Sequence, residues 1–439
     1  MAYTQFTLTD LTDQLGVLLD DTSARYWVTA EKVYAIQEAL RAYGAYTSYW
    51  RARGTFNLTV GQPYYELSSV LPALRTRTWT LNQMVQEIQY QCLEAANGIS
   101  GSGMSQQISI ASILQAISRA RNQFVIDMKF PYAVHAAFAA PGAGGMVEFP
   151  QTSVYVHRAG WQDTQSGTWT NVRREDAWAM DKAFPEWTLN PGSPLFYSEA
   201  ENAPLEMKLV PAPSASGSLE AITVDSLLMD LTDGAATFQV PDEWVHAIKY
   251  AALADMFLAE SQNKDVVRGQ YAATRYQQCV DLAREARSII RLLINNVPLP
   301  IDSFAAIDAA FPFWRNQSSQ PPMAGVLYDF LAMASLPDAA YGIAADVVQS
   351  APIPTAGGDP IPIGAEDIDH ILDYATHYLT FKCGGKEFSD TFQQYDDFMK
   401  AAAARGRISA AKIRYLVPLF ATAQKESQER PDMMEAQRA

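Results

Sequence analysis

The chain has 439 residues, of which 48% are hydrophobic and 18% are charged. Such a composition can build the cores of roughly two to four domains. Lysine and arginine number 33 against 48 aspartates and glutamates, which gives a formal net charge of −15. This excess of acid argues against a protein whose whole surface binds DNA or anionic lipid, and it permits a surface past which nucleic acid slides without adhering.

The sequence predicts a soluble, non-secreted protein with several domains and no membrane partner. Met1–Thr7 lacks a basic segment, and no apolar block of signal-peptide length follows it. The uncharged stretches Ala95–Ser118 and Phe130–Val147 are too interrupted by glycine, together with serine or proline, to be bilayer helices. The cysteines are odd in number and far apart, which favours reduced, buried thiols made in a cytoplasm: Cys92, Cys279 and Cys383.

Residues 1–129 are predicted to form a mainly helical region with a short hairpin. Apolar residues recur at helical spacing behind the expected N-caps Thr29 and Thr80. The first of these helices is expected to end near Trp50. Thr55–Thr59 and Tyr64–Leu67 alternate between polar and apolar residues, which is typical of a hairpin. A further helix is expected around residues 110–120, after a Gly/Ser-rich connector at residues 97–103.

Residues 130–297 are predicted to form a β-sandwich followed by a helical pair. Short apolar runs divided by proline and glycine indicate strands up to about Val240. At Pro241 the pattern changes to that of a helix that ends near Glu260. A second helix is expected from about Val267 to Leu293.

A repeat is predicted at an offset of 374 − 250 = 124 residues. The segment Glu243–Ala251 aligns with Asp367–Ala375, so that Tyr250 falls on Tyr374. Further ordered matches at or near this offset are His246 with His370, Met207 with Leu331, Leu209 with Met333, Pro213 with Pro337, and Trp187 with Trp314. We therefore interpret residues 298–425 as a second, diverged copy of the β-plus-helix unit, and residues 426–439 as a flexible tail. The predicted fold class is α+β: a helical N-terminal bundle followed by two related units, each a small antiparallel β-sandwich plus a helical hairpin.

Motifs for catalysis are absent from the sequence. It contains no G-x-x-x-x-G-K-[ST] phosphate loop, no H-E-x-x-H, no C-x-x-C and no G-x-S-x-G. Adjacent carboxylates such as Asp242 and Glu243 point apart in a helix or strand, so they are poor acid/base partners. We expect these two acids to complement the dipole of the helix that begins there.

The best metal candidate is the trio His370, Asp373 and His377. The spacing i, i+3, i+7 places the three side chains on one face of a helix, where a divalent ion could bind. The repeat argues against it, because the equivalents of Asp373 and His377 are Lys249 and Leu253, which do not form such a site. The sequence therefore predicts no catalytic, cofactor-binding or metal-binding residue and no cofactor.

Several short motifs resemble head-to-tail adaptor (neck, head-completion) proteins of tailed bacteriophages. They are Asp10–Asp13, Glu38–Arg41, Leu58–Leu67, Pro185–Tyr197, Leu205–Pro213 and Val240–Trp244. The resemblance covers Thr9 to about Leu293, and the second copy extends it to about Ala403. The chain is longer than a typical member, because its β-plus-helix unit is doubled.

The resemblance implies a non-enzymatic structural protein of the virion neck, synthesised in the cytoplasm of a host bacterium. It would form a ring, commonly a dodecamer, beneath the portal protein, with a tail or nozzle protein on the distal side. Genomic DNA would pass through the lumen without sequence-specific binding. Alternatives are a tail nozzle or hub protein, a minor capsid protein, a metal-assisted hydrolase that uses His370, Asp373 and His377, and a carbohydrate-binding virion module.

Overall fold

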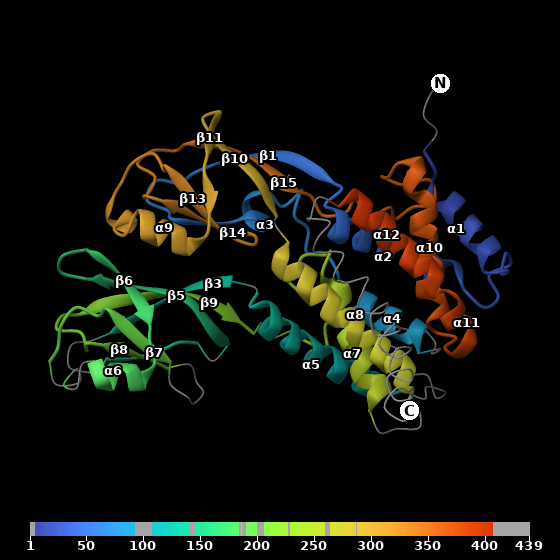
Figure 1. Cartoon of the computed structure of the whole chain (residues 1–439), viewed down its shortest axis with the longest axis horizontal. Coiled ribbons are helices and arrows are strands. Elements are labelled where there is room, and N and C mark those ends of the chain that lie inside the picture. The colour runs from blue at the N-terminus through green and yellow to red at the C-terminus, as the bar shows by residue number, and fades with distance from the viewer. Residues whose placement is uncertain are drawn as a thin grey trace, which may run out of the picture.

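The computed structural model describes residues 5–92, 108–130, 132–139, 145–150, 152–183, 186, 190–199, 206–226, 229–259, 264–286 and 288–406. The predicted connector 97–103, Trp187 of the repeat, residues 407–425 and the predicted tail 426–439 lie outside them. The described chain is a mixed α+β fold, as the sequence predicts. Helices gather at one end of the molecule, and two β regions lie one above the other at the opposite end (Figure 1).

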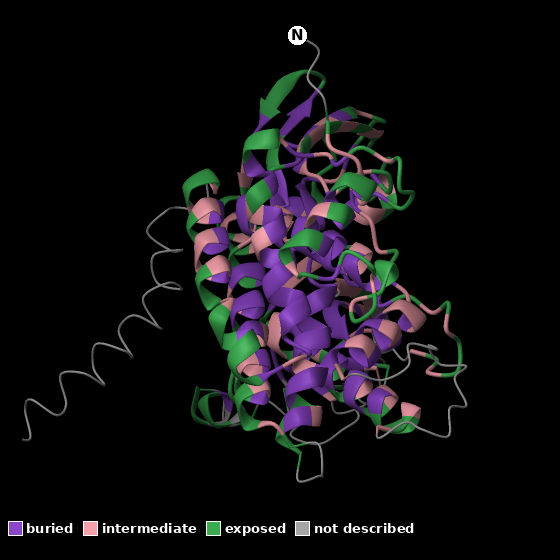
Figure 2. Ribbon diagram, turned by 90° about the vertical axis from the view of Figure 1, so that its right-hand side faces the viewer, coloured by how far each residue is buried: buried purple, intermediate pink, exposed green. Residues whose placement is uncertain are grey.

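The helices pack around a common apolar core, hereafter the helical body. Buried residues run through the middle of the group of helices in Figure 2, and one hydrophobic cluster joins residues from the N-terminal, central and C-terminal parts of the chain. The helices of the body are α1 (Leu8–Leu18), α2 (Thr29–Thr47), α4 (Leu81–Gln91), α5 (Ile110–Met128), α7 (Val245–Leu258), α8 (Val266–Glu285), α10 (Ile368–Thr380), α11 (Gly385–Asp390) and α12 (Phe392–Arg405).

Helix starts were predicted with mixed success. Thr80 is the N-cap of α4, and its hydroxyl accepts a hydrogen bond from the backbone of Gln83 while the Gln83 side chain accepts one from the backbone of Thr80. The prediction for Thr29 is wrong: this residue is the first of α2, and Val28 is a cap without a side-chain hydrogen bond. The helix ends at Thr47, because the next residue adopts the left-handed conformation.

The upper β region in Figure 1 combines strands from both ends of the chain. Its elements are β1 (Arg51–Asn57), β2 (Tyr64–Glu66), α3 (Leu67–Val70), β10 (Ile289–Ile294), β11 (Val297–Leu299), β12 (Ile301–Asp302), α9 (Phe304–Ala310), β13 (Met323–Leu327), β14 (Phe330–Ala334) and β15 (Gly342–Val348). They form two sheets, with the orders β1-β15-β10-β11 and β12-β13-β14-β2, hereafter the upper sheets. The hairpin predicted at residues 55–67 is wrong, because β1 pairs with β15 and β2 pairs with β14.

The lower β region is a single hydrogen-bonded sheet of seven strands, hereafter the lower sheet. Its elements are β3 (Tyr132–Ala139), β4 (Met146–Glu148), β5 (Ser153–Asp163), β6 (Trp169–Arg174), α6 (Ala177–Ala183), β7 (Phe196–Glu199), β8 (Glu206–Val210) and β9 (Gly217–Asp225). The order is β3-β9-β5-β6-β7-β8-β4, and its pairs are antiparallel except β6 with β7. This confirms the predicted β content of residues 130–240.

The second helix of the predicted pair is shorter than expected. Helix α8 ends at Glu285, and the apolar run that follows forms strand β10 rather than a continuation to Leu293. A tight turn then leads into β11, with Asn295 and Asn296 both at positive φ, as a two-residue hairpin turn requires.

Candidate functional site

Charged side chains lie buried at the centre of the helical body, where four helices meet. Lys249 of α7 forms ion pairs with Glu38 of α2 and, at 3.2 Å, with Glu87 of α4. Tyr250 of α7 and Tyr374 of α10 each donate a hydrogen bond of 3.0 Å to Oε1 of Glu38. These five residues, hereafter the central cluster, are all buried. They connect α2, α4, α7 and α10 through polar contacts inside an apolar core.

Burial determines the protonation of these groups. It raises the pKa of Glu87 to about 8 and lowers the pKa of Lys249 well below its ordinary value. It also lowers the pKa of Arg41, whose guanidinium stacks on Trp79, to about 10. Each shift disfavours the charged form, so Glu87 keeps its proton at neutral pH. The cluster therefore carries less charge than its residue types imply.

The central cluster has no room for a substrate. A carboxyl group with a pKa of about 8 is suited to proton transfer. However, the pocket beside Glu38 and Glu87 measures about 10 Å³, whereas small-molecule sites occupy about 300 Å³ or more. The arrangement supports a structural role: the buried polar contacts fix how the four helices pack.

A second buried ion cluster joins the upper sheets to the helical body. The guanidinium of Arg75 lies 2.7 Å from a carboxylate oxygen of Glu243, which precedes α7, and 3.1 Å from one of Asp329, between β13 and β14. It also donates a 2.9 Å hydrogen bond to the carbonyl of Val348 at the end of β15. The backbone N–H of Val348 donates to the carbonyl of Ser288 at 2.8 Å. These five residues are hereafter the junction.

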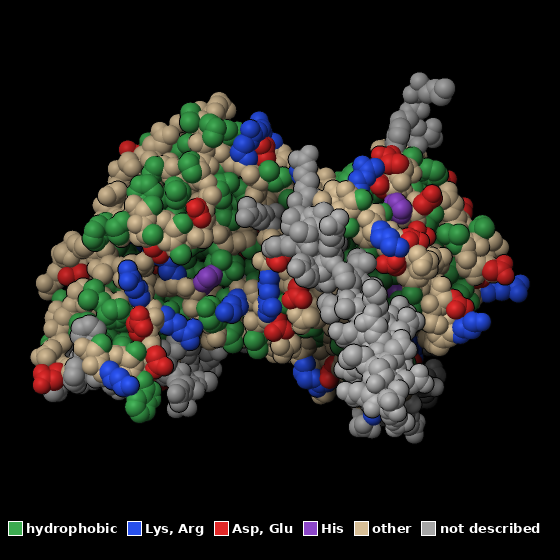
Figure 3. Space-filling view, in the orientation of Figure 1, with side chains coloured by type: hydrophobic (Ala, Val, Ile, Leu, Met, Phe, Trp, Pro, Cys, Tyr) green, Lys and Arg blue, Asp and Glu red, His purple; other side chains and the backbone are tan. Residues whose placement is uncertain are grey.

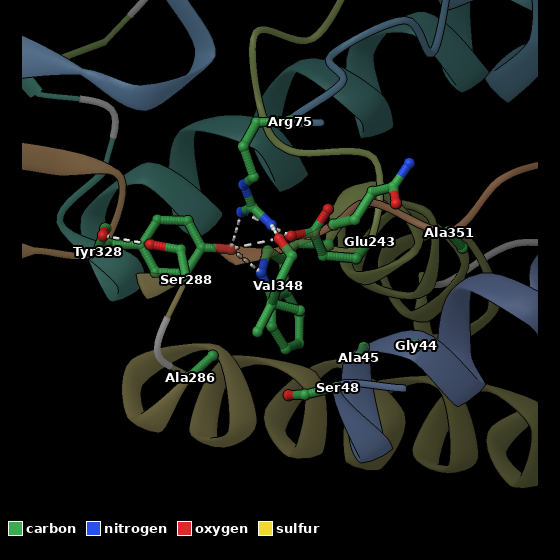
Figure 4. Close-up of a pocket in the computed structure, with 12 residues that line it drawn as sticks. Gly44, Ala45, Ser48, Arg75, Glu243, Ala286, Ser288, Tyr328, Val348 and Ala351 are labelled. Atoms are coloured by element: carbon green, nitrogen blue, oxygen red, sulfur yellow. Dashed lines mark hydrogen bonds and ion pairs between the residues drawn. The ribbon is translucent and has the colours of Figure 1, made fainter. Parts of the chain in front are cut away.

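Figure 4 shows the small pocket at the junction, with the Arg75 side chain pointing toward Glu243 and Tyr328. Its volume is about 20 Å³, close to that of a water-sized cavity. Burial alone would lower the pKa of Arg75, but the carboxylates of Asp329 and Glu243 hold it well above its ordinary value. The site therefore contains a permanent cation held by two acids. Its geometry joins the upper sheets to the helical body.

The candidate metal trio does not converge on one point. His377 is buried, and both ring nitrogens are engaged: Nε2 with the Tyr271 hydroxyl at 2.8 Å and Nδ1 with the Thr391 hydroxyl at 2.9 Å. His370 lies half-exposed, 3.9 Å from Asp373. A metal ion would have to displace a hydrogen bond of His377 to bind. Across the described part of the chain, no group of three or more His, Cys, Asp or Glu side chains is placed to hold a metal ion.

The acids predicted to complement a helix dipole have other partners. The Asp242 carboxylate accepts hydrogen bonds from the backbone of Thr78 and Trp79 and from the hydroxyls of Thr76 and Thr78. Glu243 pairs with Arg75. The prediction for these acids is wrong, because α7 begins at Val245 and the two carboxylates turn toward the segment that precedes α4.

Other predicted features can be placed in the structure. Cys279 is buried, whereas Cys92 and Cys383 are half-buried, and none of the three forms a disulfide. Among the described helices, none is both long and apolar enough to cross a membrane. Sequence reasoning missed Lys249, Glu87 and Arg75. The available signal was the presence of Lys249 and Glu87 within the apolar faces of their helices.

Comparison with known families identifies the class to which the matched part of this architecture belongs. Residues 79–293 match the model of the family described as SU10 adaptor protein. The segment is thus of the phage head-to-tail adaptor type, in agreement with the resemblance of the sequence motifs. Comparison with the curated proteins found no match. The matched region includes α4, the lower sheet, α7 and α8, and this match to a structural adaptor family points to a structural protein of a phage.

Proposed function

We propose that the protein is a structural component of the phage neck that connects the capsid to the tail. The observation that carries this proposal is the adaptor-family match over residues 79–293. The buried polar contacts support it, because those of the central cluster and the junction hold helices and sheets together and face cavities of only about 10 and 20 Å³.

In this role the chain forms a ring, as a dodecamer, beneath the portal protein, and a tail or nozzle protein binds on the distal side. Genomic DNA passes through the lumen without sequence-specific contacts. The net charge of −15 supports such passage if acids face the lumen, since they repel phosphates. Acidic and basic side chains are interspersed on the face seen in Figure 3, which lacks the broad basic surface of a DNA-gripping protein. The chain is synthesised in the host cytoplasm.

Exposed apolar side chains at the β end offer contacts for neighbouring proteins. Trp178 of α6 is 76% exposed and Phe313, after α9, is 62% exposed. Aromatic side chains such as tryptophan and phenylalanine are enriched at protein–protein interfaces relative to the rest of the protein surface. We assign these two residues to contacts with a ring neighbour or the portal.

Co-expression with the portal protein from the same genome, followed by negative-stain imaging, tests the proposal. A ring stacked on the narrow end of the portal is the expected result. A free monomer beside intact portals would count against a neck role and would favour a tail-hub or minor capsid protein. The lumen can be tested separately: replacing lumen-facing acids with lysine should slow DNA ejection, and unchanged ejection kinetics would contradict an acidic channel.

A further inference from the structure

The two β regions and their attached helices follow one plan. The lower region reads α4-α5-β3-β4-β5-β6-α6-β7-β8-β9-α7-α8 along the chain. The upper region reads α1-α2-β1-β2-α3, is interrupted, and resumes as β10-β11-β12-α9-β13-β14-β15-α10, ending with α12 after the short α11. The four-residue α3 and the short α11 have no counterpart in the lower region. Strand order also agrees: β3-β9-β5-β6-β7-β8-β4 corresponds to β1-β15-β10-β11 followed by β12-β13-β14-β2. Each strand of one region thus has a counterpart in the other, with β11 and β12 sharing the place of β6.

The pairing register agrees residue by residue. In the lower sheet Tyr132 faces Val224, and in the upper sheets Arg51 faces Val348. Tyr132 and Arg51 each follow a 19-residue helix that closes with a left-handed residue. The partners in these two pairs are Val224 and Val348. They are 124 residues apart in the sequence, the same offset that separates Tyr250 from Tyr374.

The middle strands repeat the same correspondence. Val147 faces Met207 where β4 meets β8, and Tyr65 faces Leu331 where β2 meets β14. The parallel pairs also coincide, since β6 runs parallel to β7 and β12 runs parallel to β13. Two unrelated sheets would not be expected to share order, direction and register at once.

The first helices begin in the same way. Thr80 and Thr7 are both N-caps with a reciprocal capping box. Each also forms an isolated antiparallel bridge to the segment that leads into α7 or α10, Thr80 with Thr237 and Thr7 with Pro360. The local contacts that fix the helix starts are therefore duplicated as well.

We infer that the chain is a nested duplication, in which one adaptor-type unit is inserted into another. The inner unit is residues 76–286, and the outer unit is residues 5–75 together with 288–406. The insertion falls between β2 and β10, which corresponds to the connection from β4 to β5 in the inner unit. The outer unit thus replaces the second copy expected over residues 298–425, and it takes its first strands from the N-terminal region. Its assignment to the adaptor class rests on the proposed function, because the family match covers the inner unit.

The two units meet through equivalent residues. The hydroxyl oxygens of Tyr250 and Tyr374 are 3.4 Å apart, and the rings of Phe257 and Phe381, each seven residues after the tyrosine of its unit, have centroids 5.9 Å apart. Contacts between equivalent positions are the mark of an approximate two-fold axis, as in an isologous dimer. The units are therefore a pseudo-dimer within one chain.

The interface has lost its chemical symmetry. Lys249 lies in the interface beside Glu38, whereas its equivalent, Asp373, is half-exposed beside His370. The equivalent of Glu38 is Arg119, which forms an exposed pair with Asp255. Two inner units would lack the Glu38 that compensates Lys249, so the inner unit is suited to pair with the outer unit and not with itself.

Hydrogen exchange of the free full-length chain tests the nesting without any partner. The variants Leu331→Ala and Met207→Ala truncate equivalent, fully buried residues of the outer and inner units. Leu331→Ala should raise the rate of amide hydrogen exchange at least about tenfold in residues 51–57, 64–66 and 323–348, which belong to the outer unit. The rate in residues 153–174 of the inner unit should stay unchanged. Met207→Ala should produce the reverse pattern. The inferred unit boundaries would be overturned if the exchange rate of residues 51–66 stayed unchanged in Leu331→Ala, or if it rose in Met207→Ala.

An experimental structure of the full chain provides a second test, of the duplication itself. Superposing β3, β4, β8 and β9 on β1, β2, β14 and β15 by the residue pairs above should bring α5 onto α2 and α7 onto α10, although no helix is used in the fit. Helices that fail to coincide would overturn the duplication.

Imaging of the complex with the portal protein distinguishes a failure of this inference from a failure of the proposed function. Units related by a two-fold axis cannot occupy equivalent places in a cyclic ring, so the ring should contain one whole chain per symmetry position. A ring in which inner and outer units alternate as equivalent subunits would overturn the pseudo-two-fold relationship. A chain that does not bind the portal would count against the proposed function and leave the exchange and superposition tests standing.

Discussion

Tyr250 and Tyr374, on two helices far apart in the chain, donate to the same oxygen atom of Glu38. This shared acceptor joins α2, α7 and α10 at one point in the middle of the helical body. Because neither tyrosine is accessible to water, a lost hydrogen bond there cannot be replaced by solvent. The central cluster therefore gives measurable consequences for stability.

The variants Tyr250→Phe and Tyr374→Phe should each lower the free energy of unfolding by about 1.5–3 kcal/mol, the range for a hydrogen bond to a charged group. The double variant should deviate from the sum of the two, since both hydroxyls share one acceptor. Denaturant unfolding measures these values. Tyr341→Phe is the control, because the Tyr341 hydroxyl bonds to the exposed Asp338. Equal effects of all three variants would contradict the shared-acceptor interpretation.

Removing the buried amino group of Lys249 should lower the free energy of unfolding more than removing a tyrosine hydroxyl does. Lys249→Ala leaves Glu38 without its ion-pair partner in the core, and such a loss typically costs about 3–5 kcal/mol. Thermal and denaturant unfolding would show it. Lys400→Ala is the matched control, because Lys400 pairs with Asp396 on the exposed face of α12 and should leave the unfolding midpoint unchanged. A Lys249→Ala protein as stable as the control would refute a stabilising role for the cluster.

Stability should depend on pH through His377. Burial, with a further contribution from the Arg275 charge, lowers the pKa of His377 to about 3 from an ordinary 6.5. Between these values the unfolded chain binds a proton that the folded chain does not, so stability falls as pH drops from 6.5 toward 3.

His377→Phe should remove about 1.4 kcal/mol per pH unit from the slope of unfolding free energy against pH in this window. Equilibrium unfolding at a series of pH values measures the slope. Phe392→Leu disturbs the same aromatic neighbourhood without removing a titratable group, so its slope should match that of the unmodified protein. An unchanged slope in His377→Phe would place the acid sensitivity elsewhere.

The exposed tryptophan should matter for assembly and not for folding. Trp178→Ala should weaken ring formation or portal binding, because a large aromatic side chain loses its contact area, while the unfolding midpoint stays the same. Mass photometry of portal mixtures and thermal unfolding would be compared. Val267→Ala, at an exposed site of α8, is the control. Binding that is identical in both variants would exclude Trp178 from the interface.

Local signals predicted part of the helical structure. The capping residue Thr80 and the apolar periodicity behind it depend only on neighbouring residues, so the start of α4 could be inferred from sequence. Strand partners could not be inferred in this way. Pairing of β1 with β15 joins residues nearly 300 positions apart, and alternation in β1 says which face is buried without saying which strand lies beside it.

The end of α8 shows a different difficulty. The run Ile289–Ile294 is apolar and short, which suits a buried helix turn and a buried strand equally well. The decisive feature was the Asn295-Asn296 pair, whose positive φ values favour a hairpin turn. The buried site was similarly hidden, because a charged residue such as Lys249 in a helical pattern is normally solvent-exposed. Its partners Glu38 and Glu87 come from other helices, so only the tertiary structure brings them together.

The junction places the start and the end of the inner segment on either side of one residue, Val348, which is bonded to Arg75 through its carbonyl and to Ser288 through its N–H. A segment whose two ends are neighbours can be gained, lost or exchanged as a cassette without moving the strands on either side. Arg75 and Ser288 thus mark the position at which the inner segment is inserted into the outer one. Descendants of such a chain could vary one half of the neck while inheriting the other half unaltered.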